Sequence, residues 1–162
     1  MNYETASEIE IAIANWFGWR AHVMVPNISW GLFIYELDMV VLSASGYAYE
    51  IEIKVSKSDL IRDKEKWHRH RNIRIKRLWF AVPKKLEDHI EHIPKHAGII
   101  VVSKAGIVNI VRSPIDNKLA KKLTIDEQFQ LARLGALRIW ALKTRIKELE
   151  KSRKDNSNEK NI

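Results

Sequence analysis

Apolar and polar side chains alternate along residues 34–55, and this alternation predicts two neighbouring β-strands. A period of two places the apolar side chains on one face of a sheet. These side chains are Tyr35, Leu37, Met39, Val41, Tyr49, Ile51, Ile53 and Val55. Residues 44–46 form a three-residue hairpin loop in this interpretation, with Gly46 in the left-handed conformation that such loops require.

Patterns elsewhere in the chain predict the remaining elements. Helical spacing of apolar residues and capping signals predict helices over residues 4–17, 56–70 and 84–92, and one of about twenty residues beginning after residue 124. Short apolar runs predict strands over 19–25, 78–82, 98–102 and 106–111, with the last two forming a hairpin. Residues 26–31 read as a loop and residues 152–162 as a disordered tail. The resulting fold class is α/β, with helices packed on a mixed central sheet.

The even-numbered positions of the first hairpin carry an unusual density of charge. They hold Glu36, Asp38, Glu50, Glu52 and Lys54. The predicted loop places Asp38 opposite Glu52 and Glu36 opposite Lys54, and directly opposed side chains have Cβ atoms about 5 Å apart, where like charges repel. A divalent cation would relieve this repulsion, and carboxylate oxygens suit Mg²⁺ or Mn²⁺ better than zinc.

Not every charge on this face needs a function. For Glu36 and Glu50 we favour the simpler interpretation, in which they lie on the solvated side of the sheet and Lys54 neutralises Glu36. For Asp38, Glu52 and Lys54 together we favour a site. Glu8, near the start of the first helix, either adds a further carboxylate to this site or stabilises the positive end of its own helix.

Composition and charge narrow the range of functions. The chain has 162 residues and a net charge of +8, which suits one domain, here residues 1–150, followed by a charged tail over 151–162. Residues 62–77 contain eight lysines or arginines and only two acidic residues. A basic segment beside a carboxylate cluster suits a polyanion bound through its phosphates. The chain has no cysteine, no segment of transmembrane length and no signal peptide, so we expect a cytoplasmic protein that does not bind membranes.

A longer succession of residues resembles a known superfamily. Asp38 is followed by Glu52-Ile53-Lys54 on the next strand, after a helix that carries Glu8. This arrangement is similar to the PD-(D/E)xK nucleases, although Leu37 stands where many members have proline. Further matching segments are residues 52–67, 79–83 and 97–102, and with them residues 4–140 resemble the MmcB-like DNA repair proteins of that superfamily.

The resemblance implies a restriction-endonuclease-like α-β-β-β-α-β core, to which this chain adds a hairpin and a long helix. It implies Asp38 and Glu52 as metal ligands, Lys54 as the catalytic lysine and Glu8 as an accessory acid. As a hypothesis, Asp38, Glu52 and the backbone carbonyl of Ile53 hold Mg²⁺ (or Mn²⁺). The expected function is then metal-dependent hydrolysis of DNA phosphodiester bonds, most simply as an endonuclease.

Basic side chains after the second strand are the expected DNA contacts. They are Arg62, Lys66, Arg69 and Arg71, and they would follow the phosphate backbone without reading sequence. A protein that keeps the fold and binds nucleic acid without cutting it is the alternative function. Association into a homodimer is left open.

Overall fold

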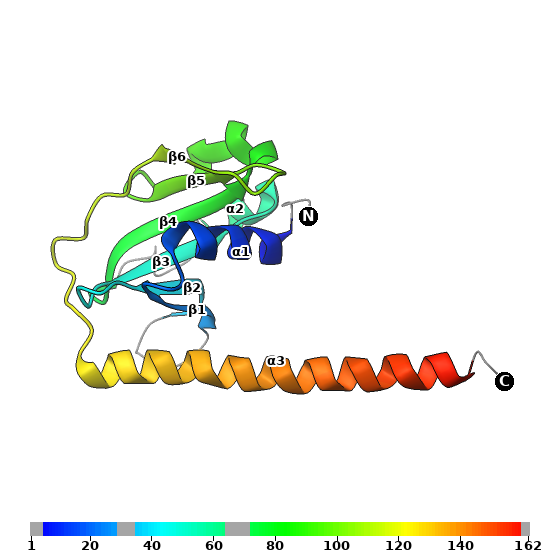
Figure 1. The fold of residues 1–162 in the computed structure, drawn as a ribbon. Coiled ribbons are helices and arrows are strands. Elements are labelled where there is room, and N and C mark those ends of the chain that lie inside the picture. The colour runs from blue at the N-terminus through cyan, green and yellow to red at the C-terminus, as the bar shows by residue number, and fades with distance from the viewer. Residues whose placement is uncertain (1–4, 29–34, 64–71, 160–162) are drawn as a thin grey trace.

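The structure, a computed structural model, describes residues 5–28, 35–63 and 72–159. The helices are α1 (Ala6–Phe17), α2 (Lys57–Asp63), the 3₁₀ helix η1 (Lys84–His92) and α3 (Ile125–Glu159). The strands are β1 (Val23–Ile28), β2 (Leu37–Leu42), β3 (Ala48–Ile53), β4 (Ile75–Pro83), β5 (Gly98–Val102) and β6 (Val108–Arg112). Figure 1 shows one sheet with helices on both sides of it.

The six strands form one mixed sheet in sequence order, from β1 to β6. The central pairs β3–β4 and β4–β5 are parallel, whereas β1–β2, β2–β3 and β5–β6 are antiparallel. The connection from β3 through α2 to β4 is therefore a βαβ crossover, as parallel neighbours require. The predicted α/β fold with a mixed sheet, an added hairpin and a long C-terminal helix is confirmed.

The hairpin of β2 and β3 has the predicted register. Its Cα partners include Met39 with Ile51 and Val41 with Tyr49, and the loop closes where the Ser43 N–H donates to the Tyr47 carbonyl at 2.9 Å. Gly46 has φ of +85°, the left-handed conformation that favours glycine. Continuing this register places Asp38 opposite Glu52.

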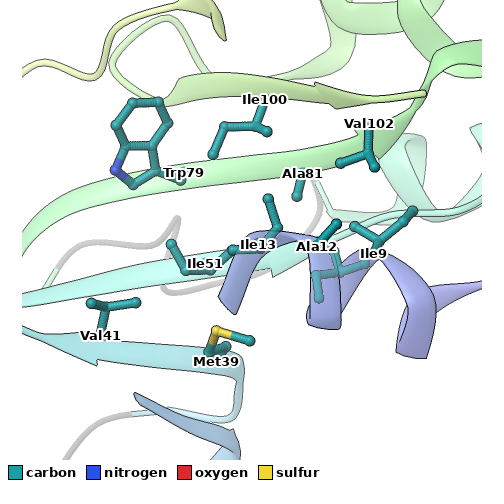
Figure 2. Close-up of a cluster of buried hydrophobic side chains, with 11 residues drawn as sticks. Ile9, Ala12, Ile13, Met39, Val41, Ile51, Trp79, Ala81, Ile100 and Val102 are labelled. Atoms are coloured by element: carbon teal, nitrogen blue, oxygen red, sulfur yellow. The ribbon is translucent and has the colours of Figure 1, made fainter. Parts of the chain in front are cut away.

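Helix α1 covers one face of the sheet. Ile9, Ala12 and Ile13 lie on the buried side of the helix. They pack against alternate residues of the four central strands β2 to β5, including Met39, Ile51, Trp79, Ala81 and Ile100 (Figure 2). The apolar odd-numbered side chains from Met39 to Ile53 therefore face α1, as the alternation predicts. Leu37 and Tyr35, predicted on the same face, pack instead in the core on the opposite side of the sheet, so the alternation is broken before Met39.

The opposite face of the sheet is also buried. Val40, Leu42 and Ala48 pack with Leu131 and Leu134 of α3, and farther along the sheet Phe80 and Val82 of β4 pack with Leu60 of α2. Val40 and Leu42 of β2 and the even-numbered residues of β3 thus point into a second core and not into water. Because of this second core, Glu50 is fully buried, and the prediction that it lies on a solvated face is wrong. Glu36 is exposed, as expected.

Some elements differ from the predicted ones. β1 begins at Val23 and continues to Ile28, through residues predicted as a loop. Pro26 is tolerated in it because β1 is an edge strand, where a missing N–H removes no necessary ladder bond. α2 is described as far as Asp63. The rest of the predicted helix, including Trp67, lies outside the described residues. Trp30, in the predicted loop over residues 26–31, also lies outside them.

Helix α3 is longer than the pattern predicts. It begins after Thr124, whose hydroxyl accepts from the Glu127 N–H at 3.2 Å, and it continues for 35 residues to Glu159. Its first turns pack against β1, and Arg138 donates to the carbonyl of Pro26 at 2.7 Å. Its second half extends past the sheet (Figure 1) and exposes Trp140, Leu142, Ile146 and Leu149. Residues 152–159, predicted as a disordered tail, are part of this helix.

Candidate active site

Asp38 and Glu52 lie on the same side of the sheet. Both carboxylates contact the Lys54 ammonium: Asp38 Oδ2 is 3.5 Å from Nζ, and Glu52 Oε2 accepts a hydrogen bond from it. Asp38 Oδ2 also accepts from the Ile53 N–H at 2.7 Å, which fixes its side chain across the hairpin. The structure therefore brings the three predicted residues Asp38, Glu52 and Lys54 together.

A third carboxylate reaches the same ammonium from α2. Asp63 Oδ1 lies 3.3 Å from Lys54 Nζ, and the Asp63 side chain is 3% exposed. Lys54 is thus paired with Glu52, Asp63 and Asp38, and its expected pairing with Glu36 is wrong. The carboxylate of Asp38 is 41% exposed, whereas that of Glu52 is 1% exposed. The cluster opens to solvent at Asp38.

Burial and charge oppose one another at this cluster. Burial raises the pKa of the Glu52 carboxyl; Lys54 lowers it, and Asp38 and Glu50 raise it further, so that the pKa lies above the usual range. For Lys54, burial disfavours the charged form, but the carboxylates of Glu52, Asp38 and Asp63 outweigh burial and raise the pKa of the ammonium above its usual value. Lys54 is therefore a fixed positive charge at neutral pH.

The partly buried Tyr35 forms a hydrogen-bonded pair with the buried carboxylate of Glu50. The Tyr35 hydroxyl donates to Glu50 Oε2 at 2.7 Å. Burial and the nearby carboxylates, that of Glu50 first, raise the pKa of Tyr35 far above its usual range, so the phenol keeps its proton. Neither residue was expected at the site. The signal was present in the apolar residues Val40, Leu42 and Ala48, which share the even-numbered face with Glu50.

The two acidic residues of α1 have different surroundings. Glu8 belongs to a capping box: its Oε2 accepts from the Thr5 N–H at 3.0 Å and from the Thr5 hydroxyl at 2.7 Å. Glu10, two positions later and thus about 200° around the helix, is affected by Asp38. Burial and the charge of Asp38 raise the pKa of Glu10, and Arg138 lowers it. Sequence reasoning selected Glu8 and missed Glu10.

The described residues offer a limited set of metal ligands. Asp38 and Glu52 supply converging oxygen atoms of the kind that Mg²⁺ prefers, and the backbone of Ile53 adjoins Asp38 through the hydrogen bond at 2.7 Å. Within residues 5–28, 35–63 and 72–159, no group of three or more acidic, histidine or cysteine side chains is arranged to hold a metal ion. Asp38 and Glu52 are thus side chains whose oxygen atoms could contribute to a Mg²⁺ site, with Lys54 as the neighbouring cation.

Of the predicted DNA contacts, only Arg62 falls in a described segment. It lies on the exposed side of α2, where its guanidinium is paired with Asp59. Lys66, Arg69 and Arg71 lie outside the described residues. None of the helices that the structure describes combines the length and apolar character needed to cross a bilayer.

Comparisons with known proteins give a matching family and a solved structure of similar fold. The model of a family described as "DNA repair protein MmcB-like" matches residues 3–146. A search among curated proteins finds no match. A solved structure of similar fold is the SPO1766 protein of unknown function from Silicibacter pomeroyi, with a TM-score of 0.61 and 19% sequence identity over 88% of this chain and 90% of that one.

Proposed function

Because the chain belongs to the MmcB-like family of DNA repair proteins, we propose that it is a metal-dependent DNA nuclease that hydrolyses phosphodiester bonds. The observation that carries the proposal is the convergence of Asp38, Glu52 and Lys54 at one point of the sheet. A buried cluster that pairs several carboxylates with one ammonium is costly to the fold. The presence of this costly cluster beside a solvent opening favours a functional role.

In this proposal Asp38 and Glu52 hold the metal ion, with the Ile53 carbonyl as a further ligand. A bound Mg²⁺ would supply Lewis-acid chemistry, by polarising a phosphate and lowering the pKa of a water molecule. Glu10 of α1 is a second candidate for the accessory acid beside Glu8, because burial and the charge of Asp38 raise its pKa. The carboxylate of Glu8 also stabilises the start of α1 by accepting from Thr5.

Lys54 acts as a cation in this scheme and not as a base. The carboxylates of Glu52, Asp38 and Asp63 surround its ammonium and raise its pKa, which favours the protonated form. The ammonium can instead orient a water molecule or stabilise negative charge that develops on the phosphate. The basic residues Arg62, Lys66, Arg69 and Arg71 would bind the DNA backbone.

Cleavage assays test the proposal directly. The purified full chain is incubated with plasmid, single-stranded and branched DNA in Mg²⁺ or Mn²⁺, beside Lys54→Ala and Asp38→Ala. We expect each substitution to reduce the rate by about 10²–10³-fold, as for loss of a group that stabilises charge in the transition state. The matched control is Glu36→Ala, which removes an exposed carboxylate two residues from Asp38 and should leave the rate unchanged. Equal cleavage by all four proteins would indicate a contaminating nuclease and defeat the proposal.

A non-cleaving DNA-binding protein is the second candidate. It is favoured by the ion pairs of Lys54, which compensate the carboxylates without any metal. Such a protein would bind DNA with strong salt dependence, would need no Mg²⁺, and would bind equally well after Asp38→Ala. Binding measured by fluorescence anisotropy, with and without EDTA, separates the two functions.

A further inference from the structure

Asp63 occupies a position that local packing fixes. Helix α2 begins at a side-chain cap, where the Ser56 hydroxyl accepts from the Asp59 N–H at 3.2 Å. Leu60 is buried in the core beneath α2, and this anchors the rotation of the helix about its axis. Asp63 follows three residues later and so lies on the same side, where its side chain is 3% exposed.

The three carboxylates around Lys54 come from three different elements. Asp38 belongs to β2, Glu52 to β3 and Asp63 to α2. The Lys54 ammonium donates a hydrogen bond to Glu52 Oε2 and forms ion pairs with the other two carboxylates, with Nζ–O distances of 3.5 Å to Asp38 and 3.3 Å to Asp63. Asp63 alone among the three is not an expected metal ligand.

We propose that Asp63 is a positioning residue, which holds the Lys54 ammonium in place when Asp38 and Glu52 are engaged by a metal ion. This inference rests on the proposed nuclease function. Two of the three partners of Lys54 would share their charge with the metal, and their hold on the ammonium would weaken. Asp63 belongs to a separate element, α2, which carries neither proposed side-chain ligand, so its ion pair with the ammonium persists and keeps Nζ beside the reacting phosphate.

The first test measures the mobility of Lys54 and needs no DNA. In the full chain saturated with Mg²⁺, ¹³C relaxation of the Lys54 ε-methylene reports its order, and Lys54→Arg assigns the signal. We expect Lys54 to be rigid in the wild type and in Asp59→Asn, which alters a more exposed acid one turn earlier on α2, where it is paired with Arg62. We expect Asp63→Asn to make the ε-methylene mobile. A Lys54 that stays equally rigid in Asp63→Asn would overturn the proposal.

The second test uses the rates of DNA cleavage. Misplacement of a catalytic group by about 1 Å can lower the reaction rate on the order of 100-fold. Asp63→Asn should therefore lower kcat by roughly tenfold to a hundredfold with little change in KM. If Asp63 acts through Lys54, adding Asp63→Asn to Lys54→Ala should cause no further loss. Independent, multiplying losses would contradict this role and indicate a general structural effect.

The two tests separate this inference from the proposed function. If no protein cleaves DNA, the nuclease proposal fails, and the relaxation measurement still decides whether Asp63 restrains Lys54. Amide spectra show whether Asp63→Asn is folded. If it is not, Asp63→Ser, which removes the charge with a smaller side chain, takes its place in both tests with the same expected results.

Discussion

Burial of charge is what distinguishes individual residues at the candidate site. Glu50, Glu52, Lys54 and Asp63 are all buried, and each depends on partners that are themselves charged or strongly polar. Burying an ionised group is costly unless opposite charges and hydrogen bonds compensate it. The free energy of unfolding should therefore depend on pH through the ionisation of this cluster, and the direction of each pKa shift gives the sign of that dependence.

Glu52→Gln should weaken the pH dependence of the protein's stability. The folded-state pKa of Glu52 is raised, chiefly by burial, so the stability of the wild type falls as pH rises through that pKa. Between pH 4 and pH 7.5 the free energy of unfolding in urea should therefore fall less for Glu52→Gln than for the wild type, beside the cost at both pH values of leaving Lys54 with one carboxylate fewer. Asp59→Asn should change the pH dependence of stability in the opposite direction. Hydrogen bonding to Ser56 and pairing with Arg62 lower the pKa of Asp59, so the ionised Asp59 carboxylate stabilises the protein and this contribution is lost as pH falls.

Tyr35→Phe tests the hydrogen bond to the fully buried Glu50. Loss of the donor leaves that carboxylate without the 2.7 Å contact, and an acceptor deprived of its partner in the core costs about 1–3 kcal/mol. We expect a decrease of that size in the free energy of unfolding in urea. Tyr49→Phe is the control, since the ring that lies 5.3 Å from the Arg77 guanidinium is retained; a similar loss in both variants would contradict the assignment.

At the level of elements, α3 has two halves with different roles. Leu131 and Leu134 complete the core against the β2–β3 face, whereas Leu142 and Leu149 are exposed. Packing of an apolar face supplies most of the stability of helices in proteins. The first half of α3 therefore belongs to the fold, and it also provides the cover that buries the even-numbered side of the hairpin.

Leu131→Ala should be strongly destabilising. Leu131 is fully buried, and removing a leucine side chain from a core costs about 2–5 kcal/mol. Leu142→Ala, on the same helix but 62% exposed, should change the free energy of unfolding by less than about 0.5 kcal/mol. Equal effects of the two substitutions in urea unfolding would show that the packing of α3 against β1 is incorrect.

At the level of elements, some features of the site can be predicted from sequence patterns and others cannot. The facing of Asp38 and Glu52 was predictable, because a short loop ending in Gly46 fixes the register of both strands. For the burial of Glu50 the local signal was only its apolar neighbours on the same face, because the residues that cover it, Leu131 and Leu134, lie some eighty positions later in the chain. Asp63 lies in the matching segment 52–67, but its contact with Lys54 was not predicted: its direction depends on how Leu60 packs beneath α2, which no local pattern reveals.

For the molecule as a whole, the site is a local concentration of negative charge in a basic protein. The chain carries a net charge of +8, while several carboxylates surround a single ammonium in the cluster. A polyanion would be attracted by the overall charge and repelled at the site itself unless a cation intervened. Binding of a divalent cation should therefore be detectable as a change in global stability.

Mg²⁺ should raise the melting temperature of the wild type by several degrees. A ligand that binds only the folded state stabilises it by about 2.7 kcal/mol at 100 times its Kd. Asp38→Asn should abolish the shift in differential scanning fluorimetry. Asp116→Asn is the matched control, because Asp116 is 42% exposed and paired with Arg77 at a distant surface, and it should retain the shift. A shift that survives Asp38→Asn would place the bound ion elsewhere.

The projecting half of α3 has a practical consequence for experiments. At about 1.5 Å per residue, a helix of 35 residues is on the order of 50 Å long, and its far end points away from the sheet (Figure 1). This helix would hold a fluorophore, affinity tag or surface tether joined to the C-terminus at a distance from the sheet. An immobilised molecule should consequently hold its sheet away from the surface to which it is tethered.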